Sequence, residues 1–282
     1  MDILNKLIAR ADEFPTLPTI YSTLSDVMSN PRSTAHDVAN IIAEDQAAAA
    51  KVLKAANSPI YGFRGRISTI SQAIIFIGFE EVRNLVIAMG IIDVFRKMKG
   101  NFPINPVDLW KHSIAVGIIT RLLGKTLRIT NLENYFLAGI LHDIGKLLFL
   151  KFIPDEYAKS IEYAMEKNLP AREAENAVLG VNHIIAGEIL AEKWKLPQSL
   201  KDAIRYHADG KIDNANNVLV GCVHIANTVA SLLELGQAGD DIVPTPNLDA
   251  WKALNLPDNF WSKNYDTLML EYDAAIGIFL LN

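Results

Sequence analysis

The sequence predicts an all-α protein, a helical bundle of two lobes, on three observations. Apolar residues recur at helical spacing along most of the chain, whereas the strict apolar and polar alternation of half-buried strands does not persist over any useful length. Two neighbouring stripes show the helical spacing clearly, namely Val38, Ile41 and Ile42, and then Ala49, Val52, Leu53 and Ala56. The 282 residues, half of them apolar, are enough to bury one large core or two modest ones.

Helices of the first half are bounded by local start and stop signals. Asp45 can cap the helix that follows it, because its carboxylate can accept from backbone N–H groups two or three residues further on. That helix ends before Pro59, since proline disfavours helical backbone in the residue that precedes it. Ser68 or Thr69 starts the next helix, and Gly78 ends it.

A further helix begins with Glu80 and Glu81, which favour the positive end of a helix, and it runs to Lys97 or Lys99. The stretch 101–106 is the clearest punctuation that follows, so we place there the boundary between an N-terminal lobe, residues 1–105, and a C-terminal lobe with its helical extension, residues 106–282. The expected helices of the second lobe are 107–125, 132–142, 155–167, 171–194, 198–207 and 217–235. The proline-containing final stretch is expected to form short helices that wrap this lobe.

Composition and charge exclude several classes of protein. The net charge of −5 comes from interspersed acids and bases, which gives no support to nucleic-acid binding. The single cysteine, Cys222, lies in an apolar run, and this suits a small buried side chain in a reducing compartment. Asp2 follows Met1 with no long apolar region behind it, so we expect no signal peptide. Apolar runs are also far shorter than the roughly 20 residues that cross a bilayer. We therefore expect a cytoplasmic protein without a membrane partner.

One cluster of residues carries the chemistry. The segment LHDIGK places His142 and Asp143 side by side before a glycine, and three other histidines, His112, His183 and His207, lie on different expected helices. A bundle core can bring such side chains together. Imidazoles mixed with a carboxylate suit iron, manganese or zinc better than calcium or magnesium. These five residues are therefore the predicted ligands of a divalent transition metal.

The order of these residues, followed by Asn227, resembles the ligand succession of HD-superfamily phosphohydrolases. The chain is most similar to one branch, the HDOD (HD-related output domain) family, over nearly its whole length. The first-half motifs that carry the resemblance are Leu17 with Pro18, IAED at 42–45, AANS at 55–58, YG at 61–62, ISTI at 67–70, AI at 73–74 and IG at 77–78. Those of the second half are AGILHDIGK at 138–146, Glu175 with GVNH at 180–183, Gly187, and WKLP at 194–197. The resemblance implies a helical output or regulatory module of bacterial signalling, usually non-catalytic, whose partners are other signalling proteins.

Departures from the active HD pattern predict a partly dismantled site. Asn227 occupies the position of the closing aspartate, and Ala208 follows His207 where related cyclic-dinucleotide phosphodiesterases carry a second histidine. The chain also lacks a Gly-Tyr-Pro sequence, and Gln46 replaces the proline usual after Asp45. Two divalent cations bring four positive charges, which a neutral amide does not offset. We predict at most one bound metal, with poor or absent turnover.

Four other polar residues could have a functional or a purely structural role. Lys146 and Arg205 are either contacts to a phosphate-containing small ligand or solvated charges. His224, three residues before Asn227, is either a substitute ligand or a packed, hydrogen-bonded side chain. His36 is expected at the surface.

Three functional hypotheses remain open from the residues. The leading one is a regulatory or scaffolding module with a vestigial metal pocket. The alternative is a metal-dependent phosphohydrolase in which an unaligned group replaces the lost aspartate. The third is a purely structural bundle whose histidines form internal hydrogen bonds. Nucleic-acid binding would require Arg64, Arg66 and Arg83 to gather on one face.

Overall fold

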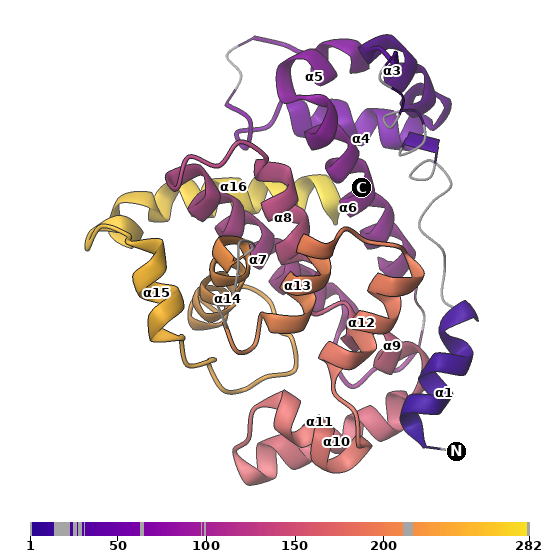
Figure 1. Ribbon diagram of the computed structural model, residues 1–282, viewed down its shortest axis with the longest axis vertical. Helices are drawn as coiled ribbons and strands as arrows, with labels where there is room; N and C mark the ends of the chain where they lie inside the picture. Colours follow the sequence, from indigo (N-terminus) through magenta and orange to yellow (C-terminus); the bar gives the residue numbers. More distant parts are fainter. Residues whose placement is uncertain are drawn as a thin grey trace.

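A computed structural model describes residues 2–13, 23–24, 27, 30, 32–62, 65–96, 98, 100–210 and 217–280, and these residues form helices and loops without a strand (Figure 1). The predicted all-α class is confirmed. Several residues named above lie outside the described residues, namely Leu17, Pro18, Arg64, Lys97 and Lys99.

The helices of the first half are α1 (Ile3–Arg10), the 3₁₀ turn η1 (Ala11–Glu13), α3 (Ala35–Glu44), α4 (Gln46–Ala56), α5 (Ile70–Ile77) and α6 (Phe79–Arg96). Their ends follow the predicted signals. The Asp45 carboxylate accepts from two backbone N–H groups in the first turn of α4. Thr69, and not Ser68, is the N-cap of α5, where it forms a capping box with Gln72. Gly78 ends α5 with a φ of 108°, a backbone conformation that favours glycine.

The helices of the second half are α7 (Pro106–Thr126), α8 (Leu132–Leu141), α9 (Gly145–Phe152), α10 (Pro154–Lys167), α11 (Ala171–Leu179), α12 (His183–Lys193), α13 (Gln198–Tyr206), α14 (Asn217–Leu232), α15 (Leu248–Leu254) and α16 (Phe260–Phe279). The prediction differs from these helices in three places. The single helix expected over 171–194 is two helices, because Gly180 adopts left-handed backbone and Asn182 caps α12. Helix α9 has no predicted counterpart. Helix α16 has 20 residues, and it is not one of the short helices expected at the end of the chain.

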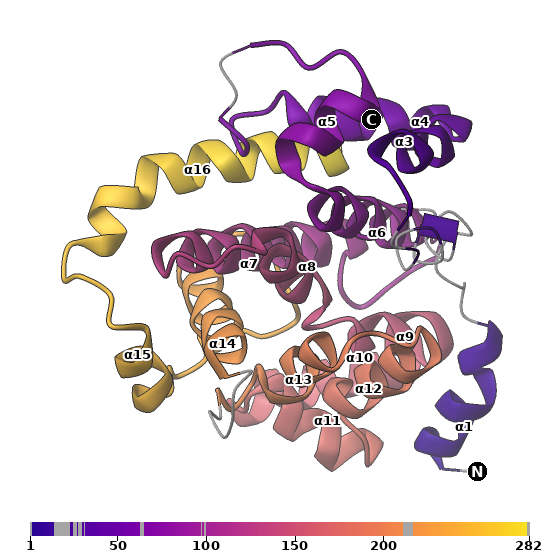
Figure 2. The same ribbon diagram turned by 45° about the horizontal axis from the view of Figure 1, so that its top comes forward.

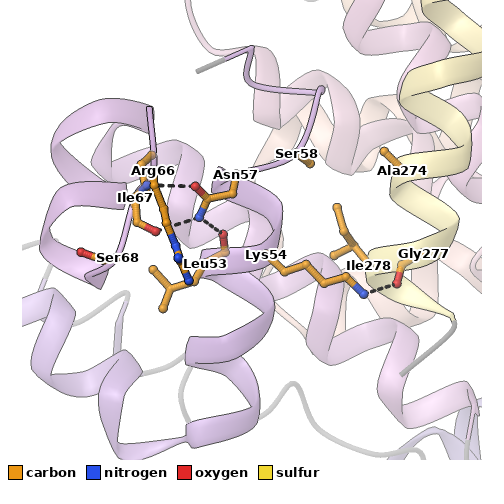
Figure 3. A pocket seen from close by; sticks show the side chains of 10 residues that line it. All are labelled: Leu53, Lys54, Asn57, Ser58, Arg66, Ile67, Ser68, Ala274, Gly277 and Ile278. Atoms are coloured by element: carbon orange, nitrogen blue, oxygen red, sulfur yellow. Dashed lines mark hydrogen bonds between the residues drawn. The ribbon is translucent and has the colours of Figure 1, made fainter. Parts of the chain in front are cut away.

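Helix α16 connects the two halves of the chain. It leaves α15, runs beside α7 and ends near α4 and α5 (Figure 2). At that end the Lys54 Nζ donates to the Gly277 carbonyl at 2.7 Å, beside a cavity of about 820 Å³ between α4 and α16 (Figure 3). Conversely, α1 lies against α9 and α12 of the second half. The two-lobe division at residue 105 stays a prediction. Helices at both ends of the chain, α1 and α16, pack against the opposite half.

Helix α7 is the centre of the second half, with α8 and α14 packed against it. Two glycines allow α7 and α8 to touch: a Cβ placed on Gly139 would lie 2.6 Å from the Gly117 Cα. Only glycine fits at such a contact between backbones. This close approach brings His112 of α7 toward His142 at the end of α8, with ring centroids 5.5 Å apart.

Among the described residues, no helix has both the length and the apolar character that crossing a membrane requires.

Candidate metal centre

The five predicted ligands meet in one buried place, although four different helices supply them. His112 stands in the second turn of α7, His142 caps the end of α8, His183 opens α12, and His207 caps the end of α13. Asp143 lies in the turn between α8 and α9. All five are at most 4% exposed. Five of the six histidines of the chain are buried, and the exception, His36, is exposed as predicted.

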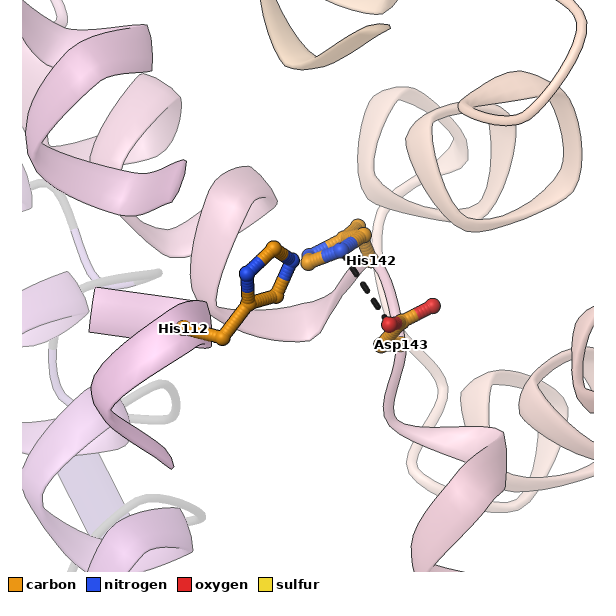
Figure 4. A group of neighbouring side chains, drawn as sticks. All are labelled: His112, His142 and Asp143. Carbon is orange, nitrogen blue, oxygen red and sulfur yellow. Dashed lines mark ion pairs between the residues drawn. The ribbon is translucent and has the colours of Figure 1, made fainter. Parts of the chain in front are cut away.

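Asp143 is the hub of this cluster. Its Oδ1 lies 3.4 Å from both His183 Nε2 and His207 Nε2, and its Oδ2 lies 3.4 Å from His142 Nε2. Figure 4 shows His142 between His112 and Asp143. The potential ligand atoms form two groups, each within 4.8 Å: His112, His142 and Asp143, and Asp143, His183 and His207. Asp143 belongs to both groups.

The outer nitrogens of three rings are held by acceptors. His142 Nδ1 donates to the Gly139 carbonyl at 2.7 Å, and His207 Nδ1 donates to the Ile204 carbonyl at 2.8 Å. His183 Nδ1 donates to Glu175 at 2.6 Å. An acceptor that carries no proton fixes the N–H at Nδ1, which leaves the Nε2 lone pair free to bind a metal.

The inner nitrogens test whether a cation fits. In a neutral ring the Nε2 atoms of His142 and His207 present lone pairs to the Asp143 carboxylate, so acceptors face acceptors across 3.4 Å. The Nε2 of His142 is buried and has no hydrogen-bond partner. A buried acceptor without a partner is costly, and a divalent cation held by either ligand group would replace acceptor–acceptor contacts with metal–ligand bonds. The donor set therefore fits a transition metal.

The charge states of the cluster also favour cation binding. Burial lowers the pKa of His112 and of His207 to about 4, so both rings are neutral near pH 7. Burial alone would raise the pKa of Asp143, but the Lys146 ammonium and His142 hold it well below its usual range. Burial would likewise lower the pKa of His183, and the Glu175 carboxylate outweighs this effect and raises it. A proton and a metal ion thus compete for His183 Nε2.

Lys146 is an interior cation. It is 1% exposed, and its Nζ lies 2.8 Å from Asp143 Oδ2 and 3.1 Å from Asp240 Oδ2. The solvated-charge interpretation is wrong for Lys146, because the ion pairs keep the ammonium inside the protein. Arg205 is different: its side chain is 59% exposed and pairs with Glu188 on the surface.

The positions near the missing aspartate are hydrogen-bonded. Asn227 Oδ1 lies 2.9 Å from His112 Nε2. In an active HD site, an aspartate at position 227 and His112 would bind the same metal, whereas here the amide contacts the ring directly. His224 donates from Nδ1 to the His207 carbonyl and accepts at Nε2 from the Asn247 N–H. Both ring nitrogens of His224 are occupied, which confirms the packed, hydrogen-bonded interpretation.

Two acids of the site were not predicted as functional residues. Glu175 is fully buried and orients His183, and the GVNH sequence, which ends eight residues later at His183, is the signal that could have pointed to it. Asp240 reaches Lys146 from 94 positions away in the chain, and no local pattern predicts such a contact.

A segment after α14, residues 233–247, crosses the cluster, and we call it the strap. Two cavities share its residues. One, of about 210 Å³, reaches Asp143, Lys146 and the rings of His183 and His207. The other, of about 340 Å³, lies on the side of His112. Asn227, Asp240 and Pro244 line both cavities.

Comparison with known proteins identifies the family. The HDOD domain model matches residues 14–210. The chain belongs to the HDOD domain family. This confirms the resemblance carried by the motifs and by the all-α fold.

Individual relatives are distant in sequence and close in fold. An uncharacterized protein of Treponema pallidum (strain Nichols) is 27% identical over 199 residues, which are 70% of this chain and 38% of that protein. The chain thus spans about two fifths of the length of this curated relative. The crystal structure of an HDOD domain protein of unknown function from Geobacter sulfurreducens is 26% identical, covers 99% of this chain and 100% of that chain, and has a TM-score of 0.80. A candidate phosphohydrolase from Shewanella amazonensis SB2B is 26% identical, covers 96% and 98% of the two chains, and has a TM-score of 0.69.

Proposed function

We propose that this chain is a cytoplasmic bacterial signalling module that holds one divalent transition metal (iron, manganese or zinc) and regulates other signalling proteins without hydrolysing a phosphoester. One observation carries the proposal. Among the described residues, Asp143 supplies the single carboxylate of both ligand groups, and its Oδ2 already pairs with the Lys146 ammonium.

The charges of the cluster limit it to one ion. A second divalent cation would raise the added charge to four positive units, beside a buried lysine, with one ligand carboxylate to offset it. Buried charge without compensation is strongly unfavourable. A second ion on the side of His112 would also have to break the 2.9 Å contact between His112 Nε2 and Asn227. The side of Oδ1, with His183 and His207, supports the single ion.

Hydrolysis needs more than this cluster offers. A bound metal supplies a hydroxide nucleophile at neutral pH and a positive charge that stabilises phosphoryl oxygens, and binuclear sites divide these two tasks between their ions. Lys146 provides a cation, but Asp143 and Asp240 neutralise it. The alternative function is phosphohydrolase activity. Its support is the similarity to the candidate phosphohydrolase from Shewanella amazonensis.

Signalling through protein partners requires an exposed contact surface. Helix α5 offers adjacent apolar side chains, Ile75, which is 77% exposed, and Phe76, which is 44% exposed. Larger contiguous apolar patches are typical of interaction surfaces, and these two side chains would form part of one. We propose that other signalling proteins bind there.

The deciding experiment measures metal content and turnover in the same preparations. Purified protein, loaded with manganese or iron, is expected to hold at most one ion per chain and to leave phosphomonoesters, phosphodiesters and nucleotides intact. Asp143→Ala should lose the metal, whereas the exposed control His36→Ala should keep it. Two ions per chain, with turnover that Asp143→Ala abolishes, would establish the phosphohydrolase instead. A protein with no metal, whose stability does not change on chelation, would establish the purely structural bundle.

A further inference from the structure

The strap places a carboxylate where a ligand would bind. Asp240 Oδ2 accepts from Lys146 Nζ at 3.1 Å, and its Oδ1 accepts from the backbone N–H of Ala171 at 2.7 Å. Ala171 is the first residue of α11, so this N–H points out of the positive end of a nine-residue helix. A buried ammonium and a helix N-terminal amide together form a binding site for an oxyanion.

This oxyanion site opens into the cluster. The cavity of about 210 Å³ is lined by Lys146, Asp240 and Asp143, and by the rings of His183 and His207. The Asp240 side chain is 23% exposed, whereas Lys146 is 1% exposed. The carboxylate of Asp240 therefore lies on the outer side of the ammonium, between Lys146 and solvent.

Anchors on both sides of Asp240 hold the strap independently of this contact. At one end Gly236, with a φ of 85°, lies so close to α7 that a Cβ would be 2.2 Å from the backbone N of His112. The next residue, Gln237, donates its N–H to the Asp108 carbonyl. At the other end Asn247 donates to His224. Asp240 can leave Lys146 while these anchors stay in place.

Charge counting indicates which ligand would replace Asp240. Lys146 and the two carboxylates that pair with it, Asp143 and Asp240, together carry a net charge of −1. Removing Asp240 and adding one divalent cation changes this to +2. A phosphate dianion matches that charge, and it carries enough oxygens to reach both Lys146 and the Ala171 N–H.

We propose that Asp240 is an intramolecular placeholder for the phosphate group of a small ligand, and that ligand binding to Lys146 and the Ala171 N–H displaces Asp240 and loosens the middle of the strap. The single metal of the proposed function strengthens this site, so the inference rests on that function. Release of the strap changes the surface beside the cluster, and it gives the module a way to report the ligand.

The test uses inorganic phosphate as the probe and the full chain, loaded with manganese and metal-free, in titration calorimetry. Asp240→Asn removes the charge and nearly keeps the shape, so it should bind phosphate at least tenfold more tightly than the native protein. Lys146→Met should bind at least tenfold more weakly than Asp240→Asn. The matched control Asp241→Asn alters a neighbouring exposed acid that does not contact Lys146, and it should equal the native protein.

Hydrogen exchange provides a second measurement that does not depend on a variant. Phosphate should increase amide exchange over residues 238–246 of the native protein, and a purely structural Lys146–Asp240 pair would leave it unchanged. Equal phosphate affinity in native protein and Asp240→Asn, or no change in exchange at saturating phosphate, would overturn the placeholder. Metal content and turnover, measured on the same samples, report separately on the proposed function.

Discussion

Gly145→Ala should damage both the fold and the candidate metal centre. Gly145 opens α9 two residues after Asp143, and it lies against the start of α12. A Cβ at this position would be 1.9 Å from the His183 carbonyl oxygen and 2.5 Å from the Gly187 nitrogen. Both atoms belong to the backbone of α12, so no side-chain rotation can relieve the clash.

The size of the effect follows from these distances. Ordinary contact begins near 3.4 Å, so α12 must retreat by about 1.5 Å from the new methyl group. Overpacking that flexible side chains can absorb costs about 1–3 kcal/mol, and a clash with backbone belongs at or above the upper end of that range. The same retreat would carry His183 away from Asp143, from which its Nε2 is now 3.4 Å distant. Displacement of a ligand should weaken metal affinity by about 10- to 100-fold, the range seen when the supporting residues of metal sites are altered.

Urea unfolding of metal-free protein and competition with a chelator measure the two effects separately. Gly277→Ala in α16 is the matched control, because a Cβ there meets nothing within 4 Å. Alanine in an open helical position should raise the free energy of unfolding by roughly 0.5–1 kcal/mol. If Gly145→Ala unfolds within about 0.5 kcal/mol of the native protein and binds metal equally well, the packing argument fails.

Three other outcomes are expected. Asn227→Asp places a carboxylate 2.9 Å from His112 Nε2, so it should raise metal affinity or bring the metal content toward two ions per chain. If elemental analysis gives the same metal content as in the native protein, the amide does not disable the site. Metal-free protein should lose stability as the pH falls from 6.5 to about 4, since burial lowers the pKa of His112 and His207 to about 4 and the unfolded chain then binds more protons. The loss is at most about 3 kcal/mol per histidine. Urea unfolding at several pH values should show a smaller loss of stability in His112→Asn than in the native protein. The exposed control His36→Asn should follow the native curve. Burial raises the pKa of Cys222 from 9.0 to about 12, so its thiolate population at pH 8 falls about a thousandfold, and alkylation detected by mass spectrometry should require unfolding; rapid labelling of native protein would contradict this burial.

Local signals were sufficient for much of the fold. The N-cap at Asp45, the start of α5 and its end at Gly78 involve hydrogen bonds and backbone angles within a few residues, and the sequence predicts all of them. The break between α11 and α12 also had its signals, Gly180 followed by the capping Asn182. Apolar periodicity on both sides of that break favoured one long helix, but the local signals of Gly180 and Asn182 determine the structure.

Contacts between distant segments were not predictable in the same way. The histidines and Asp143 could be grouped because a metal site needs ligands of these types. Lys146 had two interpretations, and its burial depends on Asp240, 94 residues later, in a segment with no helical pattern. The role of α16 is similar, since it meets α4 in contacts such as that of Lys54 with Gly277, 223 residues apart in the chain.

Lys146 also couples the two proposed events at this site. Its ammonium is shared between Asp143, which faces the metal ligands, and Asp240, which holds the strap. A cation bound at Asp143 weakens the attraction of that carboxylate for Lys146, and phosphate in the place of Asp240 brings negative charge that stabilises the cation. Because binding free energies are linked, manganese should tighten phosphate binding by the same factor as phosphate tightens manganese binding. Calorimetric titrations in both orders test this equality. Both affinity increases should become smaller in Lys146→Met, because that substitution removes the charge that links the manganese site to the phosphate site.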